Sequence, residues 1–457
     1  MKKVKHLFLG FSFLILSASV FAQEVETTGI EEIIVTARQQ AESLQDVPVT
    51  VSVMSEVDLD RYNITSLTDA AKMVPNFRIN AGGSGNGSNI YLRGIGSSSI
   101  SAAFDQSVAI NIDGVVVNRG RFIHNAYLDM SQIEVLKGPQ SLYFGKSATA
   151  GVISIKTNDP TDEFEAEFGV GVETEHETTF FEGVISGPIS DNLLARLAFG
   201  TSETDELREN YSFANDPMPY GNGTKPYFGE ESTNARLTLL WTPTETLTAK
   251  LKYQYSKYEN DGGGTMYQEE WCADGLGNPL AHQTTGVPGA TAAFTTRLGV
   301  DDCVVNGNTS KINLEPGLRA GLPYGFDNGE PGLDQETDLI SLQINWDIND
   351  DLSLTSITSI VELDHVELDD YSYGAGVYGG LHRNVYEHTS QELRLTSDFD
   401  GAFNFQAGLF VQEIEQRFDA HQYAFNLPIT PNIFGPALAF FGAFDPTAPL
   451  VGPDPAT

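Results

Sequence analysis

The sequence has little cysteine, an unusually small share of basic side chains and no long apolar stretch after its first 22 residues. Two cysteines stand against 44 glycines, 27 phenylalanines and 17 tyrosines, which suits a β-rich protein with many turns. Lysine and arginine number 26 against 62 acidic residues, for a net charge of -36, so binding of nucleic acid through a basic face is excluded. The acidic excess indicates solvated loops; an acidic rim that attracts cations is the alternative.

The balance of apolar and charged residues narrows the class of protein further. Hydrophobic residues make up 40% of the chain and charged residues 19%. This composition is too apolar for a disordered chain and too polar for a helical membrane protein. After Ala22 no apolar stretch is long enough for a transmembrane helix. If the chain lies in a membrane, it must therefore do so as a β-barrel, because only helices and closed barrels satisfy their backbone groups in lipid.

The first 22 residues have the pattern of a secretory signal peptide. Three lysines precede an apolar run over residues 7–16, and Val20-Phe21-Ala22 supplies small residues at the cleavage positions. A membrane anchor is the alternative, but the run is too short to span ~30 Å of hydrocarbon. We expect cleavage after Ala22 and export of the mature chain.

The next two segments differ in composition. Residues 23–45 are polar apart from one apolar knot, which predicts a flexible tail with a short motif inside it. Residues 46–158 read as a small α/β domain, with an alternating strand near residue 50 and two helix starts at Ser55 and Ser66. Asp113-Gly114 lies between alternating apolar runs, a strong hairpin signal. Residues 82–87 form a glycine-rich loop.

From about residue 159 to residue 457 the pattern changes to alternating segments separated by turns. About nine strands of roughly ten residues are expected, a length that crosses a bilayer when tilted. Short turns are expected near 188–192, 242–246, 349–351 and 399–402, and long polar loops near 204–230, 259–334 and 367–385. Alternation of short and long connections is typical of an outer-membrane barrel. A soluble β-sandwich is the weaker alternative, since it has less reason to sort its loops by length.

Two groups of motifs carry a resemblance to TonB-dependent outer-membrane receptors. The segment EEIIVTA at residues 31–37 resembles the TonB box of that family. The segment at residues 133–155, IEVLKGPQSLYFG followed by AGVISI, resembles the end of the family's plug domain. Matching stretches are YLRGIG at 91–96, the strand and turn at 108–114, and the mid-barrel strand TSQELRL at 389–395. Their order after a signal peptide is highly specific.

The sequence also departs from the family pattern. Lys137, Ser141 and Ala150 replace residues that are usually Arg, Gly and Gly, which could shift turns of the plug. The family's barrel has 22 strands, whereas this chain ends in what reads as the fifth external loop. We therefore expect a truncated sequence or fragment, because nine strands would leave two open edges in lipid. The expected fold is a small α/β plug domain followed by an incomplete antiparallel transmembrane β-barrel.

The resemblance implies active import of a scarce, bulky ligand across the outer membrane of a Gram-negative bacterium. The TonB–ExbB–ExbD complex would pull on the TonB box, for which the expected coupling residues are Ile33, Ile34, Val35, Thr36 and Ala37. A ferric siderophore is the family default; oligosaccharides, cobalamin and other organic nutrients are alternatives. A passive porin lacks a TonB box and a plug, and a signalling transducer would need a further domain before the box.

The resemblance places further residues in plug motifs. They are Arg93, Gly94, Asp113, Gly114, Lys137, Gly138, Pro139, Gln140, Gly145 and Gly151. Arg93 and Lys137 are expected to pair with acidic groups of the plug or the barrel wall. Asp113-Gly114 is expected to be a turn without a chemical role.

Cys272 and Cys303 fall in the longest expected external loop. In an exported chain, two cysteines in one loop favour a disulfide. It would close about 31 residues and restrain the unfolded loop by roughly 3–4 kcal/mol. A metal-binding pair is the minor alternative, since no histidine or second cysteine pair accompanies it.

Signals for enzymatic activity are poor. Gly374, Gly376 and Gly379 give a GxGxxG match, but in a loop with no helix to receive a pyrophosphate. His365 lies among acidic residues and could suggest a metal site, although a strand leaving the membrane into an acidic loop explains it better. We predict no catalytic residue, no metal and no cofactor.

Overall fold

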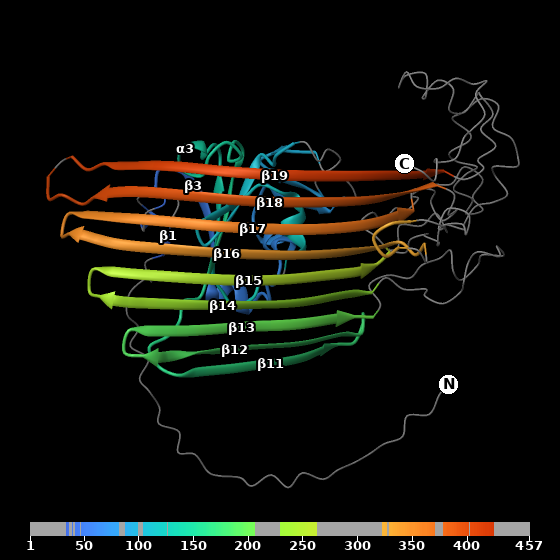
Figure 1. Cartoon of the computed structure of the whole chain (residues 1–457), viewed down its shortest axis with the longest axis horizontal. Helices are drawn as coiled ribbons and strands as arrows, with labels where there is room; N and C mark the ends of the chain where they lie inside the picture. Colours follow the sequence, from blue (N-terminus) through green and yellow to red (C-terminus); the bar gives the residue numbers. More distant parts are fainter. Residues whose placement is uncertain are drawn as a thin grey trace, which may run out of the picture.

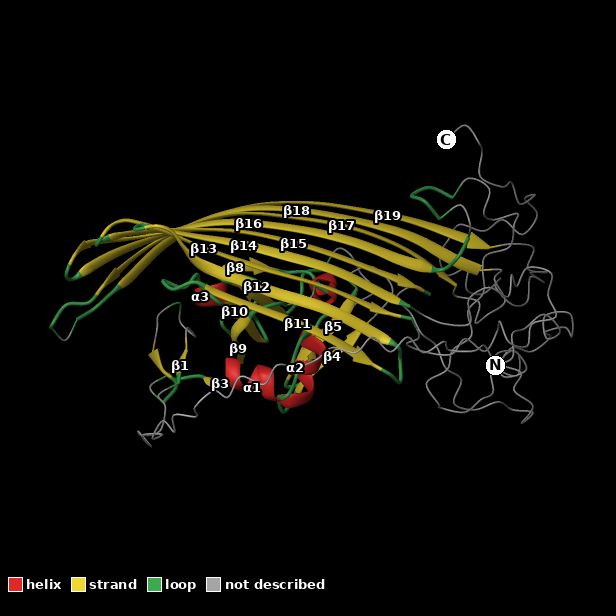
Figure 2. Cartoon of the chain, turned by 90° about the horizontal axis from the view of Figure 1, so that it is seen from below, coloured by secondary structure: helices red, strands yellow, loops and turns green. Residues whose placement is uncertain are grey.

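A computed structural model gives the arrangement of the chain over twelve segments. The structure describes residues 33–35, 39, 42–45, 47–81, 87–98, 104–125, 127–205, 229–262, 322–326, 329–370, 378–401 and 403–424. Within them, no helix has the length and apolar character needed to cross a membrane. Two bodies are seen: a small mixed domain and a long curved sheet that arches over it (Figure 1, Figure 2).

The small domain is built on a five-stranded sheet of order β3-β9-β10-β7-β8. The pair β10–β7 is parallel and the remaining pairs are antiparallel. A three-stranded antiparallel sheet, β4-β5-β6, and three short helices with a 3-10 helix complete it. The elements are β3 (Thr50–Ser55), α1 (Glu56–Arg61), α2 (Leu67–Met73), β4 (Phe77–Ala81), β5 (Ser88–Leu92), β6 (Ile95–Gly96), β7 (Val108–Ile112), β8 (Val115–Val117), η1 (Gly120–His124), β9 (Met130–Lys137), α3 (Ser141–Phe144) and β10 (Gly151–Thr157).

Local signals in the sequence set several of these elements. Ser55 caps α1 in a capping box with Asp58, and the Ser66 hydroxyl accepts from the Asp69 amide at the start of α2. At the β7–β8 hairpin, Asp113 and Gly114 have φ of 48° and 91°. Both central residues thus have positive φ, as the type I′ hairpin turn requires. The helix and hairpin predictions are confirmed at these positions.

The curved sheet has nine strands in sequence order, every neighbouring pair antiparallel. The strands are β11 (Glu165–Glu173), β12 (Thr178–Ser190), β13 (Leu193–Thr204), β14 (Glu230–Thr244), β15 (Leu247–Asp261), β16 (Gly332–Asn349), β17 (Leu352–Asp370), β18 (Tyr378–Ser397) and β19 (Gln406–Ala424). The number of strands in this described part agrees with the prediction. Their lengths, 9 to 20 residues, exceed the expected ten on most strands.

The longer strands continue beyond the stretch in which apolar and polar residues alternate. In β17 the exposed apolar face ends at Ile360 and is followed by Glu362 and Asp364, yet the ladder with β18 runs on to Asp370. Hydrogen bonding between backbones does not need an apolar face, so polar extensions escape a search for hydrophobic periodicity. The four turns predicted to be short, which follow β12, β14, β16 and β18, lie at one end of the sheet, which we call the short-turn end (Figure 1). The long connections leave from the opposite end, where the turn between β11 and β12, residues 174–177, also lies.

The outer face of the sheet is apolar in a slanting band. If the paired residues are followed from strand to strand, Val172 of β11 lies level with Asp419 of β19. On β19, however, the highest exposed apolar residue on this face is Val411, eight residues lower. Eight residues at ~3.4 Å over eight strand spacings of ~4.8 Å correspond to a slope of about 35°. Strands of membrane barrels tilt by this amount, so the band lies level when the strands are tilted as in lipid.

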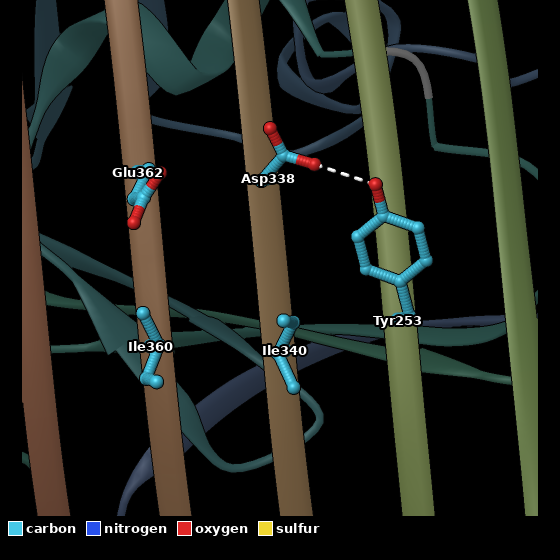
Figure 3. Close-up of a pocket in the computed structure, with 5 residues that line it drawn as sticks. All are labelled: Tyr253, Asp338, Ile340, Ile360 and Glu362. Atoms are coloured by element: carbon cyan, nitrogen blue, oxygen red, sulfur yellow. Dashed lines mark hydrogen bonds between the residues drawn. The ribbon is translucent and has the colours of Figure 1, made fainter.

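A shallow hollow of about 440 Å³ marks the upper edge of this band on β15–β17. Ile340 and Ile360, both more than 40% exposed, form its apolar part, and Asp338 and Glu362 lie one step further along the same strands (Figure 3). The Tyr253 hydroxyl donates to Asp338 over 2.7 Å. An aromatic ring with its polar tip at such an edge is typical of a membrane interface.

The small domain packs against the concave face of the sheet (Figure 2). Its main core includes Leu67, Ile90, Ile110, Phe122 and Ile153, and side chains of the sheet join the same cluster: Leu339, Val361, Leu363 and Tyr386. A second core lies on the other side of the five-stranded sheet, around Ala109, Leu136 and Val152. The two bodies therefore share buried apolar surface, which stabilises their association.

Candidate functional site: the coupling segment and the plug–wall interface

The segment singled out as a TonB box is docked where the structure describes it. Ile34 and Val35 form β1 (Ile34–Val35), which pairs antiparallel with β2 (Glu42–Ser43). Val35 is fully buried in the second core, while Ile33 and Ile34 are 43% and 44% exposed. The sequence suggested a flexible tail here; burial of one apolar residue and a two-stranded pairing hold this part in place instead. Thr36 and Ala37 lie outside the described residues.

Side chains of the plug and of the wall hold this hairpin. The Gln132 amide donates to the Ile34 carbonyl over 3.1 Å. Arg394, pointing inward from β18, donates to the Gln39 carbonyl over 2.8 Å and pairs with Glu392 at 2.6 Å. Gln39 has a φ of 61°, a left-handed conformation that turns its carbonyl toward the wall. The hairpin lies toward the end of the sheet that carries the short turns (Figure 2).

The residues assigned to plug motifs occupy turns and strand ends of the small domain. Arg93 and Gly94 form the β5–β6 turn; Lys137 ends β9; Gly138, Pro139 and Gln140 connect β9 to α3; Gly145 follows α3; and Gly151 begins β10. At Gly151, with a φ of 156°, an added Cβ would lie 2.3 Å from the Leu136 carbonyl oxygen. A side chain there would separate β10 from β9, which gives this motif glycine a packing role.

The expected acidic partners of Arg93 and Lys137 are not found among the described residues. The Lys137 amine donates to the Pro75 carbonyl over 3.0 Å. Partial burial and then repulsion by Arg93 lower the pKa of Lys137. The two cations therefore lie near each other rather than each beside a carboxylate in this part of the chain.

Asp113 was expected to be only a turn residue, but its carboxylate joins the plug to the wall. It accepts from the Thr157 amide at 3.0 Å and from the Thr157 hydroxyl at 2.7 Å. Lys252 of β15 reaches it at 3.0 Å and also donates to the Thr157 hydroxyl. Burial favours the neutral acid, but Lys252 and the Thr157 amide outweigh it and hold the pKa of Asp113 below its ordinary value. The carboxylate is therefore ionised when the plug is folded.

Asp129 is the second carboxylate of this interface, and sequence reasoning missed it. Arg196 of β13 donates to both of its oxygens, at 2.6 and 2.8 Å, in a bidentate pair. Arg236 of β14 donates to the same carboxylate at 2.8 Å and to the carbonyls of Leu128 and Asp129. Despite its burial, these arginines hold the pKa of Asp129 below its ordinary value. No local pattern marks Asp129, since its partners follow 67 and 107 residues later.

A third contact lies nearer the long connections, where η1 meets β16 and β17. Arg121 and Glu367 are fully buried and pair at 3.2 Å. The Gln335 amide donates to the Arg121 carbonyl and to Asn125, and its oxygen lies 3.1 Å from His365. His365 thus lies inside β17 and faces the plug. Its place beyond Glu362, at the upper edge of the apolar band, agrees with a strand leaving the membrane, but the expected acidic loop begins later because β17 continues to Asp370.

Two predictions fall on residues whose positions are not described. Cys272 and Cys303 lie outside the described residues, as do Gly374 and Gly376 of the GxGxxG match, and Gly379 belongs to β18. The disulfide stays a prediction. In the described segments, no three histidine, cysteine or acidic side chains lie close enough to hold a metal ion.

Comparison with known proteins agrees with this geometry. The family profile described as TonB-dependent Receptor Plug Domain matches residues 43–152, the segment that forms the small domain under the sheet. The chain belongs to the TonB-dependent receptor family. The small domain is its plug and the nine-stranded sheet is wall of an outer-membrane β-barrel. The family consists of receptors and transporters rather than enzymes.

The receptor has curated relatives that are outer-membrane proteins by name. It is 28% identical over 264 residues to an iron-regulated outer membrane virulence protein of Vibrio cholerae, covering 55% of this chain and 37% of that protein. It is 30% identical over 199 residues to a vitamin B12 transporter of Vibrio vulnificus, covering 41% and 30%. The chain therefore spans about a third of the length of these relatives.

Among solved structures, the ferric yersiniabactin uptake receptor of Yersinia pestis superimposes with a TM-score of 0.65. The superposition covers 86% of this receptor and 53% of that chain, at 18% identity. At this identity the likeness establishes the fold, a plug against a barrel wall, and leaves the ligand to other arguments.

Proposed function

We propose that the protein imports a bulky, scarce ligand, a ferric siderophore, across the outer membrane with energy supplied by the TonB–ExbB–ExbD complex. The observation that carries the proposal is a plug ion-paired to the inside of the wall, with an apolar segment docked at the short-turn end. A plug fixed in this way obstructs passive diffusion, so transport needs work on the plug. This favours a gated transporter over a passive porin.

The proposed division of the chain follows from this function. Residues 1–22 are a leader, residues 23–45 carry the coupling segment, residues 46–158 are the plug, and residues 159–457 are wall and external loops. Residues 33–37 are proposed as the segment that TonB engages. Ile33 and Ile34 are accessible, whereas Val35 is buried and must leave the second core before a partner strand can pair with both sides of the segment.

Arg394 and Gln132 hold this segment in its docked position, and we propose that their contacts break when TonB engages it. Both donate to carbonyls of the segment or of the loop that follows it. Each such hydrogen bond contributes about 1 kcal/mol net, more for the charged donor. The segment is thus held firmly enough to stay docked at rest, and weakly enough for strand pairing with a partner to replace the lost contacts.

The coupling proposal is tested by Ile34→Pro in the full-length protein. Proline removes the backbone donor that an added strand needs, so we expect energised uptake and binding of the purified periplasmic domain of TonB both to fall at least tenfold. Ile34→Ala is the matched control, because it removes the same exposed side chain and keeps the amide. Uptake by the proline variant equal to that of Ile34→Ala would refute the role of the segment.

The ligand proposal rests on relatives and neighbours whose names refer to iron or to ferric siderophores. Cobalamin is the second candidate, favoured by the 30% identical vitamin B12 transporter. Oligosaccharides and other organic nutrients remain a further class. The experiment compares uptake of ⁵⁵Fe-yersiniabactin and ⁵⁷Co-cobalamin by cells with and without the full-length gene. Loss of ⁵⁵Fe uptake alone supports the siderophore; loss of ⁵⁷Co uptake alone replaces it with cobalamin.

A second arm of this experiment separates active from passive transport. Uptake is measured in cells that lack the inner-membrane motor, with the receptor present at its normal level. Receptor-dependent uptake that persists without the motor would overturn the gated mechanism and favour the porin.

A further inference from the structure

Asp113 and Asp129 lie close together on the plug and meet three cations from three consecutive strands of the wall. Arg196, Arg236 and Lys252 come from β13, β14 and β15, and each is less than a tenth exposed. The Asp129 carboxylate accepts two hydrogen bonds from Arg196, one from Arg236 and one from Asn158. We call these five charged residues the β13–β15 anchor.

Neighbouring backbone groups extend the anchor beyond the ion pairs. Arg236 donates to the carbonyls of Leu128 and Asp129, and the Asn158 amide also donates to the Asp129 carbonyl. Thr157, at the end of β10, binds Asp113 through both its amide and its hydroxyl. Movement of the plug away from β13–β15 would therefore separate buried charges and take the Arg236 donor from the Leu128 and Asp129 carbonyls, which is costly in a buried interface. The bonds from Thr157 and Asn158 lie within the plug, so they would persist and keep both carboxylates in position.

The β1–β2 hairpin, which we call the coupling hairpin because it carries residues 33–35, is attached to the wall in a different way. In the described part of the hairpin, the wall contact is Arg394, which donates to the carbonyl and the side-chain oxygen of Gln39. Arg394 is also paired with Glu392 on its own strand, so its charge keeps a partner when the hairpin leaves. Release of the hairpin therefore leaves the Arg394 charge beside its counter-ion, whereas release of the β13–β15 anchor separates three wall cations from Asp113 and Asp129.

We propose that the β13–β15 anchor is a fixed attachment that stays closed throughout transport, so that the plug is remodelled in place and never detaches from this part of the wall. The proposal rests on the proposed energised transport. Asp113 and Asp129 are positioning residues in it: they hold β7–β10 against β13–β15 while the coupling hairpin is drawn away. The passage for the ligand then opens along a side of the plug other than the one that faces β13–β15.

A pair of reversible tethers in the full-length receptor tests this inference. Leu128 lies beside Gly200 of β13, where an added Cβ would be 3.0 and 3.2 Å from the Leu128 methyl carbons. Leu128→Cys with Gly200→Cys therefore bridges plug and wall next to the anchor. Gln39→Cys with Arg394→Cys is the comparison tether at the coupling hairpin. Both variants are made with Cys272 and Cys303 replaced by serine. Where an engineered cysteine pair does not form a disulfide directly, a reducible thiol-reactive linker with a one-carbon spacer joins the two sulfurs.

Motor-dependent uptake of ⁵⁵Fe-yersiniabactin is measured before and after reduction of each tether. We expect the closed 128–200 tether to keep at least half of the reduced rate, and the closed 39–394 tether to lose uptake at least tenfold until it is reduced. A tenfold loss with the 128–200 tether, restored by reductant, overturns the inference. The reduced form of the same protein shows that the variant folds.

Hydrogen exchange separates failure of this inference from failure of the proposed function. If the unmodified receptor shows no motor-dependent uptake of this probe, the full-length protein is exchanged in detergent over a urea series. A fixed attachment requires amides of residues 128–130 and of β10 to stay protected at urea concentrations where β1 and β3 have already exchanged. Exchange of residues 128–130 and β10 together with β1, or before it, overturns the anchor whatever the ligand.

Discussion

Replacing Asp129 by asparagine should destabilise the plug by about 3 kcal/mol. The change keeps the size of the side chain but removes the charge that Arg196 and Arg236 share. Breaking a buried ion pair typically costs about 3–5 kcal/mol. The lower end applies here because Arg196 keeps Glu165 at 3.3 Å and Arg236 keeps two carbonyls. For a domain of this size, about 3 kcal/mol corresponds to a fall of about 12 °C in Tm.

The assay is calorimetry of the full-length receptor in detergent, with the plug transition assigned by hydrogen exchange. Glu165→Gln is the matched control: it removes a carboxylate from the same Arg196, but Glu165 is 46% exposed and the pair should contribute at most about 1 kcal/mol. A Tm of the Asp129→Asn plug within 3 °C of the control would refute the reasoning, because the two carboxylates would then contribute equally despite their different burial.

Three further results are expected. The plug should keep a constant Tm from about pH 7 to pH 5 and lose stability below about pH 4. Folding lowers the pKa values of Asp113 and Asp129, so their contribution to stability disappears as pH falls through the folded values. An Asp113→Asn, Asp129→Asn double variant should lack this loss of stability in acid, measured by calorimetry. Gly151→Ala should lower plug stability by roughly 2–4 kcal/mol, measured by urea titration, because a Cβ there meets a backbone carbonyl. Cys272 and Cys303 should be bridged, so two free thiols in non-reducing mass spectrometry of the intact protein would exclude the disulfide.

Features set by neighbouring residues were predictable from the sequence. The capping serines at residues 55 and 66 and the turn at Asp113-Gly114 act within three or four residues, and their elements appear where expected. The strands of the wall were predictable because one face meets lipid, which imposes a period of two over ten residues. Their upper extensions were not, because Glu362, Asp364 and Glu367 interrupt the apolar pattern of β17. The apolar residues that remain there, Leu368 and Leu381, pack in a separate small cluster.

The contacts between the plug and the wall could not be predicted from the sequence, for a different reason. Asp129 and Arg196 look like ordinary surface charges, and only the fold brings them to 2.6 Å. Arg121 and Glu367 lie 246 residues apart and are both fully buried, contrary to what their side chains alone would indicate. The docking of Val35 likewise depends on apolar residues contributed by three later strands. The polar residues around Val35 therefore predicted a flexible tail where the chain is in fact docked.

The slant of the apolar band means that no two strands of the wall are interchangeable. Each carries its lipid-facing segment about one residue lower than the strand before it, so the correct height of a strand depends on every ladder that precedes it. A slip of two residues in a single pairing would keep the inside and outside faces correct and yet move all later segments by ~7 Å relative to the bilayer. Burial of the apolar band in the bilayer therefore favours the correct pairing of every strand, because a single slipped pairing misplaces all the strands that follow.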